Sequence, residues 1–183
     1  MISIWTILDP FYYALTRLQY VENEEKEKQI FRVRLTRYKG KDLMLTDGTL
    51  IKKNDLLLKI HLHNIRIIHE MRGQRSEVRK ALFLYKKVEK ALPYLAHYIE
   101  AHPRSTEIKG IIGITVLNKG TERLGFEMFT LHNSFYIGIK RFIAIPIYLL
   151  SNSMGKHSAM QKKPCYLCMS KEKLLKSYCK VGS

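Results

Sequence analysis

Long apolar runs are missing from the sequence. The longest late run, from Phe142 to Leu150, has nine residues and contains Pro146. This run is too short for a helix that crosses a bilayer, which needs about 20 apolar residues. The amino-terminal stretch MISIWTILDPFYYALTRL has no basic leading segment, and Asp9-Pro10 interrupts its apolar run. It is therefore a poor signal peptide, and we expect no export by that route.

Cysteine is also scarce, with only Cys165, Cys168 and Cys179. Together with the missing export signal, this predicts a cytoplasmic protein with reduced thiols. A mixed metal site that adds His157 is conceivable, but its spacing matches no common zinc module. A redox pair would open a helix after a strand, which Pro164-Cys165 does not clearly provide. We therefore expect unreactive thiols, no metal site and no cofactor.

Acidic residues are few: 16 Asp and Glu stand against 32 Lys and Arg, for a net charge of +16. The excess is uneven. Residues 31–73 hold 10 bases and 4 acids (+6), and residues 152–183 hold 7 bases and 1 acid (+6). Such a field favours polyanionic partners: nucleic acid, an anionic membrane surface or phosphorylated small molecules. The charge does not choose among these classes.

Common catalytic motifs are absent. The sequence has no phosphate-binding loop, no GxSxG, no HExxH and no dinucleotide fingerprint. The absence of these motifs favours a binding protein over an enzyme, although it does not exclude catalysis.

Strand patterns dominate the first part of the chain. Residues 31–38, FRVRLTRY, alternate apolar and polar side chains, which predicts a half-buried strand. The alternation gives the strand an apolar face and a polar face: Phe31, Val33 and Leu35 against Arg32, Arg34 and Thr36. Turns at Asp47-Gly48 and Asn54-Asp55 separate further short strands, at about 42–46, 49–52 and 55–63. The result is a small meander of basic-faced strands.

Helices frame this meander. Asp9 and Pro10 suit the start of a first helix, to which we assign five aromatic residues: Trp5, Phe11, Tyr12, Tyr13 and Tyr20. A second helix should run from Ser76 to about Ala101, where Pro93 is expected to kink or split it. Its apolar residues recur every three or four positions to form one stripe: Val78, Leu82, Tyr85, Val88, Leu92, Leu95 and Ile99.

The rest of the chain continues with helix and strand patterns. Residues 110–117, GIIGITVL, predict a central strand covered on both faces. A helical turn before Leu124-Gly125, a strand at about 126–131, a helix at about 134–150 and a short helix after Ser170 should follow. We therefore expect an α/β or α+β fold. Residues 1–151 should form a single domain, with the basic, cysteine-containing segment 152–183 packed on it.

The stretch LLLKIHLHN, residues 56–64, is the most informative site pattern. On a strand, Lys59, His61 and His63 share one face. The simplest interpretation is a polar outer face that ends at Asn64, which would cap the following turn. The same Leu-His-Asn sequence recurs at His132.

Two other interpretations of this face remain open. A metal site would need a third ligand, and the Lys59 ammonium would repel a cation. An anion site would use the donors and positive charge of Lys, Arg and imidazole side chains. The candidate ligand-binding residues are Arg32, Arg34, Lys59, His61, His63, Asn64 and His132.

Three segments carry a resemblance to a known family. The stretch TDGTLIKKNDLLLKIHLHN (46–64), the helix after it and ERLGFEMF (122–129) resemble the YkoP-like domains of Bacillus and related spore formers. Some members of that family are fused to polysaccharide deacetylase domains, and others stand alone. The resemblance implies an accessory module linked to envelope glycan metabolism. It supplies no catalytic residues, and the deacetylase metal motifs are not present here.

These observations predict a non-catalytic module that binds an anionic or phosphorylated ligand, or the inner face of the membrane. Envelope-glycan enzymes are its expected protein partners. One alternative is a nucleic-acid-binding protein, which the net charge supports equally well. Another is an enzyme that uses His61 or His63 as a general base, for which a nearby carboxylate or nucleophile would be required.

Overall fold

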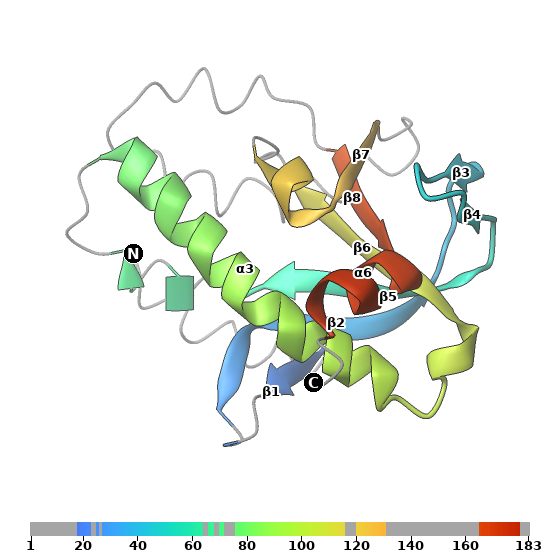
Figure 1. Cartoon of the computed structure of the whole chain (residues 1–183), viewed down its shortest axis with the longest axis horizontal. Helices are drawn as coiled ribbons and strands as arrows, with labels where there is room; N and C mark the ends of the chain where they lie inside the picture. The colour runs from blue at the N-terminus through green and yellow to red at the C-terminus, as the bar shows by residue number, and fades with distance from the viewer. Residues whose placement is uncertain are drawn as a thin grey trace.

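Figure 1 shows a computed structural model of the chain, in which two helices lie over a twisted sheet. The structure describes residues 18–22, 25, 27–63, 66–67, 70–71, 76–115, 120–130 and 165–179. The helices expected to start at Asp9 and to span about 134–150 lie outside these residues.

The described residues form one mixed sheet of six strands in the order β1-β2-β5-β6-β8-β7. Its strands are β1 (Gln19–Glu22), β2 (Lys28–Arg37), β5 (Leu56–Leu62), β6 (Ile108–Thr115), β7 (Glu127–Thr130) and β8 (Cys165–Ser170). Neighbouring strands are antiparallel except β5 and β6, which run parallel. The sheet and its helices make an α+β fold, as the sequence predicts.

The parallel pair needs a crossover connection, which helix α3 (Glu77–Glu100) supplies between β5 and β6. The Ser76 side chain caps this helix by accepting a hydrogen bond from the Arg79 amide. A short 3-10 helix, η1 (Ser105–Glu107), then leads into β6. β6 has β5 on one side and β8 on the other, which confirms the predicted central strand.

Helices α3 and α6 (Lys171–Tyr178) pack against each other and cover one face of the sheet (Figure 1). The carboxyl-terminal half of α3 supplies the deepest contacts, since Leu92, Leu95 and Ile99 are fully buried. Of the two expected effects of Pro93, a split is wrong, because α3 continues through this residue, and a kink stays a prediction. Burial of these side chains outweighs a proline cost of about 3 kcal/mol. The predicted stripe is wrong at its amino-terminal end, where Val78 and Leu82 are exposed.

The opposite face of the sheet carries a smaller apolar cluster beside the hairpin of β3 (Leu43–Met44) and β4 (Leu50–Ile51). The predicted Asp47-Gly48 turn closes this hairpin, and Gly48 has a φ of 86°. Glu127 of β7 holds the hairpin against the sheet by accepting hydrogen bonds from the amide and the hydroxyl of Thr46.

The last part of the fold comes from residues beyond the expected domain boundary at 151. β8 lies between β6 and β7, so residues 165–170 are an internal strand of the sheet. η2 (Thr121–Leu124) provides the predicted helical turn before Gly125. The Ser170 hydroxyl caps α6, the predicted short helix.

No helix among the described residues is long and apolar enough to cross a membrane.

Candidate anion-binding site

Strand pairing gathers basic side chains on the sheet face opposite α3. In the antiparallel register of β2 and β5, Arg32 faces His61 and Arg34 faces Lys59. Directly opposite residues project from the same face, and alternation places His63 there as well. We call Arg32, Arg34, Lys59, His61 and His63 the basic site.

The basic site is not the solvent-exposed outer face expected from the sequence. Arg32 is only 4% exposed, and the other four side chains are half-buried. Nε of Arg34 and Nε2 of His61 are buried without a hydrogen-bond partner among the described residues. Polar atoms removed from water without a partner cost free energy, so these two positions are suited to a bound group.

Arg34 and Lys59 at the centre of the basic site have no acidic partner in the part of the chain that the structure describes. Within the described residues, no ion pair joins Arg34 or Lys59 to a carboxylate. Burial, followed by the nearby Arg34 charge, lowers the pKa of Lys59. A bound anion would offset both effects, because it would supply the missing negative charge and accept hydrogen bonds.

His61 is held neutral by this environment. Burial lowers its pKa first, and the charges of Lys59, Arg34 and Arg32 add to the effect, bringing it to about 3. A general base works best with a pKa near the working pH, so His61 is a poor general base in the free protein. The described residues also place no third His, Cys, Asp or Glu within metal-binding reach of His61 and His63.

Tyr20 is part of this site, although the sequence analysis assigned it to the first helix. It lies on β1, where its phenolic oxygen accepts a hydrogen bond from Nη2 of Arg32 at 2.6 Å. The rings of Tyr20 and His63 meet edge to face, with centroids 5.6 Å apart. Nζ of Lys28 lies 4.8 Å from the same ring centroid. Tyr20 thus contacts Arg32 and His63 of the basic site and also the neighbouring Lys28.

The remaining predicted site residues, Asn64 and His132, lie outside the described residues. Their role in ligand binding stays a prediction.

The cysteines of β8 cannot act as a pair. Cys165 packs against the core under α3, whereas Cys168 belongs to the cluster on the opposite face. Residues three apart on a strand point to opposite sides, so neither a disulfide nor a shared metal fits. Burial is the main cause that raises the pKa of Cys168 to about 12. This thiol is inert at neutral pH.

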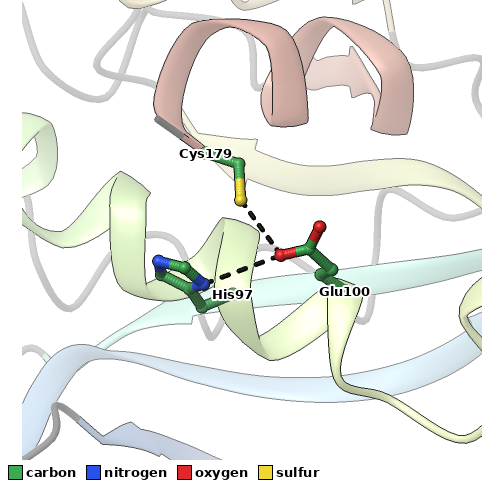
Figure 2. Close-up of side chains that lie close together, drawn as sticks. All are labelled: His97, Glu100 and Cys179. Carbon is green, nitrogen blue, oxygen red and sulfur yellow. Dashed lines mark hydrogen bonds and ion pairs between the residues drawn. The ribbon is translucent and has the colours of Figure 1, made fainter. Parts of the chain in front are cut away.

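A second group of reactive side chains was missed by the sequence analysis. His97 and Glu100 of α3 lie beside Cys179, the residue that follows α6 (Figure 2). The spacing of His97 and Glu100 on one helix face was a usable signal. Cys179 is distant in sequence, and only the packing of α6 on α3 brings it to the pair.

Comparison with known proteins identifies the family. The model of the YkoP domain matches residues 1–178. The chain belongs to the YkoP family. It is 48% identical over 179 residues to "Uncharacterized protein YkoP" of Bacillus subtilis (strain 168), covering 97% of this chain and 95% of that relative. No solved structure shows a significant match to this YkoP domain. The match includes β8 and α6, so both belong to the YkoP domain.

Proposed function

We propose that this YkoP domain is a non-catalytic binding module that holds the phosphate group of a small ligand at the basic site. The observation that carries the proposal is the unpaired positive charge of Arg34 and Lys59, half-buried on the sheet face and without a described acid beside it. Buried charges of one sign cost stability, so a protein that keeps them gains from a ligand that neutralises them.

The degree of burial favours a small ligand. A membrane surface or a nucleic-acid backbone is recognised by exposed cations, whereas these side chains are partly covered. A phosphate group is small enough to approach half-buried donors, and Arg and Lys suit its oxygens. Neutral His61 adds a nitrogen that donates or accepts a hydrogen bond, depending on its tautomer.

We place this ligand among the phosphorylated precursors of envelope glycans, with envelope-glycan enzymes as partners. This part of the proposal depends on the family resemblance, since some YkoP-like domains are joined to polysaccharide deacetylase domains. A cytoplasmic location, or a peripheral one at the inner membrane face, would give access to such precursors.

Nucleic acid is the second candidate ligand, and the net charge of +16 favours it. An anionic membrane surface is the third. Both would use exposed Lys and Arg more than the half-buried pair.

Calorimetric titration tests the proposal. Pyrophosphate and a sugar 1-phosphate are titrated into the purified chain at about 0.15 M salt, where weak surface attraction is screened. We expect Lys59→Met and Arg34→Met each to weaken binding about tenfold or more, because a hydrogen bond to a charged group contributes about 1.5–3 kcal/mol. The control is Lys86→Met, which removes an exposed lysine of α3. Equal affinity in all three variants would refute the site.

A further inference from the structure

His97, Glu100 and Cys179 meet on the helical side of the molecule, away from the basic site. His97 and Glu100 occupy the last turn of α3, three residues apart. Cys179 directly follows α6, and its amide donates to the Leu175 carbonyl at 2.8 Å. Figure 2 shows the imidazole and the thiol approaching the same carboxylate from the two helices. We call these three residues the helix-end triad.

The three donor atoms are close enough to share one ion. Sγ of Cys179 lies 3.0 Å from Oε2 of Glu100, and Nδ1 of His97 lies 3.7 Å from the same oxygen. All three donor atoms lie within 4.8 Å of one another. Around tetrahedral zinc, bonds of about 2.0–2.3 Å separate neighbouring ligand atoms by about 3.3–3.5 Å. Small side-chain rotations therefore suffice to bring the triad to that geometry.

The donor set selects the type of metal. Thiolate and imidazole ligands favour Zn²⁺ and similar transition metals, whereas Mg²⁺ and Ca²⁺ require mostly oxygen ligands. His97 and Glu100 are exposed, so water has access to the remaining coordination position. Among the described residues, no other group of three His, Cys, Asp or Glu side chains meets this distance criterion.

A catalytic thiol is a poorer explanation of the same cluster. In a Cys–His pair, the imidazole contacts the sulfur and accepts its proton. Here Glu100 lies between the other two and accepts the thiol hydrogen bond itself.

We propose that the helix-end triad is a transition-metal site that binds Zn²⁺ and fastens the end of α6 to α3. On binding, the Cys179 S–H bond breaks, a sulfur–metal bond forms and the proton passes to the solvent, with no electron transfer. The site departs from the expectation, drawn from the sequence, that the chain holds no metal. It is independent of the anion proposal, since it lies on the opposite face of the sheet and uses none of the same residues.

Spectroscopic titration with Co²⁺ tests this site in the full chain, after treatment with a chelator and under a reductant. We expect a near-ultraviolet band from thiolate-to-Co²⁺ charge transfer that saturates at one ion per chain and is displaced by Zn²⁺. Zn²⁺ should also raise the melting temperature, because it binds the folded state. Cys179→Ser should abolish the band, and His97→Gln should weaken Zn²⁺ binding about tenfold or more.

Two controls make the outcome decisive. Cys165→Ser, which alters the thiol of β8, should leave the band and the Zn²⁺ affinity unchanged. Circular dichroism should show that every variant melts cooperatively, since His97 and Glu100 are exposed and Cys179 is only half-buried. The proposal fails if no thiolate band forms at a roughly tenfold molar excess of Co²⁺. It also fails if the band survives Cys179→Ser, because the metal would then use another cysteine.

Discussion

Lys59 and Arg34 stand directly opposite each other on neighbouring strands, with like charges and little solvent. Opposed like charges destabilise a sheet, and burial adds a desolvation cost. At the residue scale, the basic site therefore lowers the stability of the free protein. A structural role alone does not account for keeping both cations.

Replacing Lys59 should separate stability from binding. We expect Lys59→Met to increase the free energy of unfolding of the ligand-free protein by about 1 kcal/mol, since it removes a like-charge pair and keeps the chain length. Urea unfolding at neutral pH measures the change, with exposed Lys86→Met expected to stay within about 0.5 kcal/mol of wild type. A clear loss of stability in Lys59→Met would show that the ammonium is well satisfied without a ligand.

His61 should make stability depend on pH. Its pKa is 6.5 in an ordinary setting and about 3 in the folded protein. Between these values the unfolded chain binds the extra proton, so the free energy of unfolding falls as the pH drops from about 6.5 towards 3. His61→Gln should remove this component. Urea unfolding at about pH 7, 6 and 5 should therefore show wild type losing more stability than the variant; parallel losses would contradict the low pKa.

Sequence reasoning at this scale found the basic site but not its burial. Alternation predicts that Arg32 and Arg34 share one face of their strand and that Lys59 and His61 share one face of theirs. The register of β2 and β5 then shows that these two faces lie on the same side of the sheet. Whether that face meets water depends on segments distant in sequence, which a local pattern does not encode. For the same reason, Cys179 could not be joined to His97 and Glu100.

At the scale of elements, the main chain of β8 approaches β6 so closely that one position of β6 has no room for a side chain. A β-carbon at Gly110 would overlap the main-chain carbonyl oxygen of Met169 on β8. At Gly113 of the same strand, the nearest atom is in the flexible Ile60 side chain, at 3.2 Å. Glycine is therefore required more strictly at position 110 than at position 113.

This difference gives a matched pair of variants. Gly110→Ala should lower the free energy of unfolding by about 1–3 kcal/mol, because the strand backbone must shift to relieve the overlap. Gly113→Ala should cost less, since a side chain can rotate away. Thermal unfolding of both variants checks the order. A larger loss in Gly113→Ala would mean that β6 and β8 pair in another register.

Element boundaries and types were predictable where the side-chain period was clear. The strand periodicity of 31–38 and the apolar run 110–117 correspond to β2 and β6 with shifted ends. Tyr20 was assigned to a helix because its own strand, β1, has only the four residues QYVE. Sequence patterns were also insufficient within helix α3, which continues through Pro93 and leaves Val78 exposed. Tertiary packing decides whether a helix tolerates a proline and which part of its apolar stripe is buried.

At the scale of the whole molecule, the charge of +16 ensures some attraction to any polyanion. Binding to DNA or vesicles at low salt therefore carries little information. The informative comparison is made near physiological salt, where non-specific DNA affinity is only about micromolar or weaker.

We expect sedimentation with anionic vesicles and binding to duplex DNA to disappear near about 0.15 M salt, because exposed charges are screened over about 8 Å. Lys59→Met should not change either low-salt affinity by more than its single charge predicts. Cosedimentation measures binding to the vesicles, and fluorescence anisotropy measures binding to the duplex DNA. Nanomolar DNA binding that survives this salt would replace the small-ligand account with the nucleic-acid alternative, and surviving vesicle binding would favour the membrane surface.

The most direct measurement of the central claim is an NMR titration of the His61 imidazole with and without saturating pyrophosphate. In the free chain the ring should stay neutral to about pH 4, as its pKa of about 3 requires. Phosphate bound beside Arg34 and Lys59 would stabilise the protonated imidazole, so the pKa of His61 should rise by about one unit or more. An unchanged His61 titration under conditions where pyrophosphate is bound would place the anion elsewhere and contradict the account.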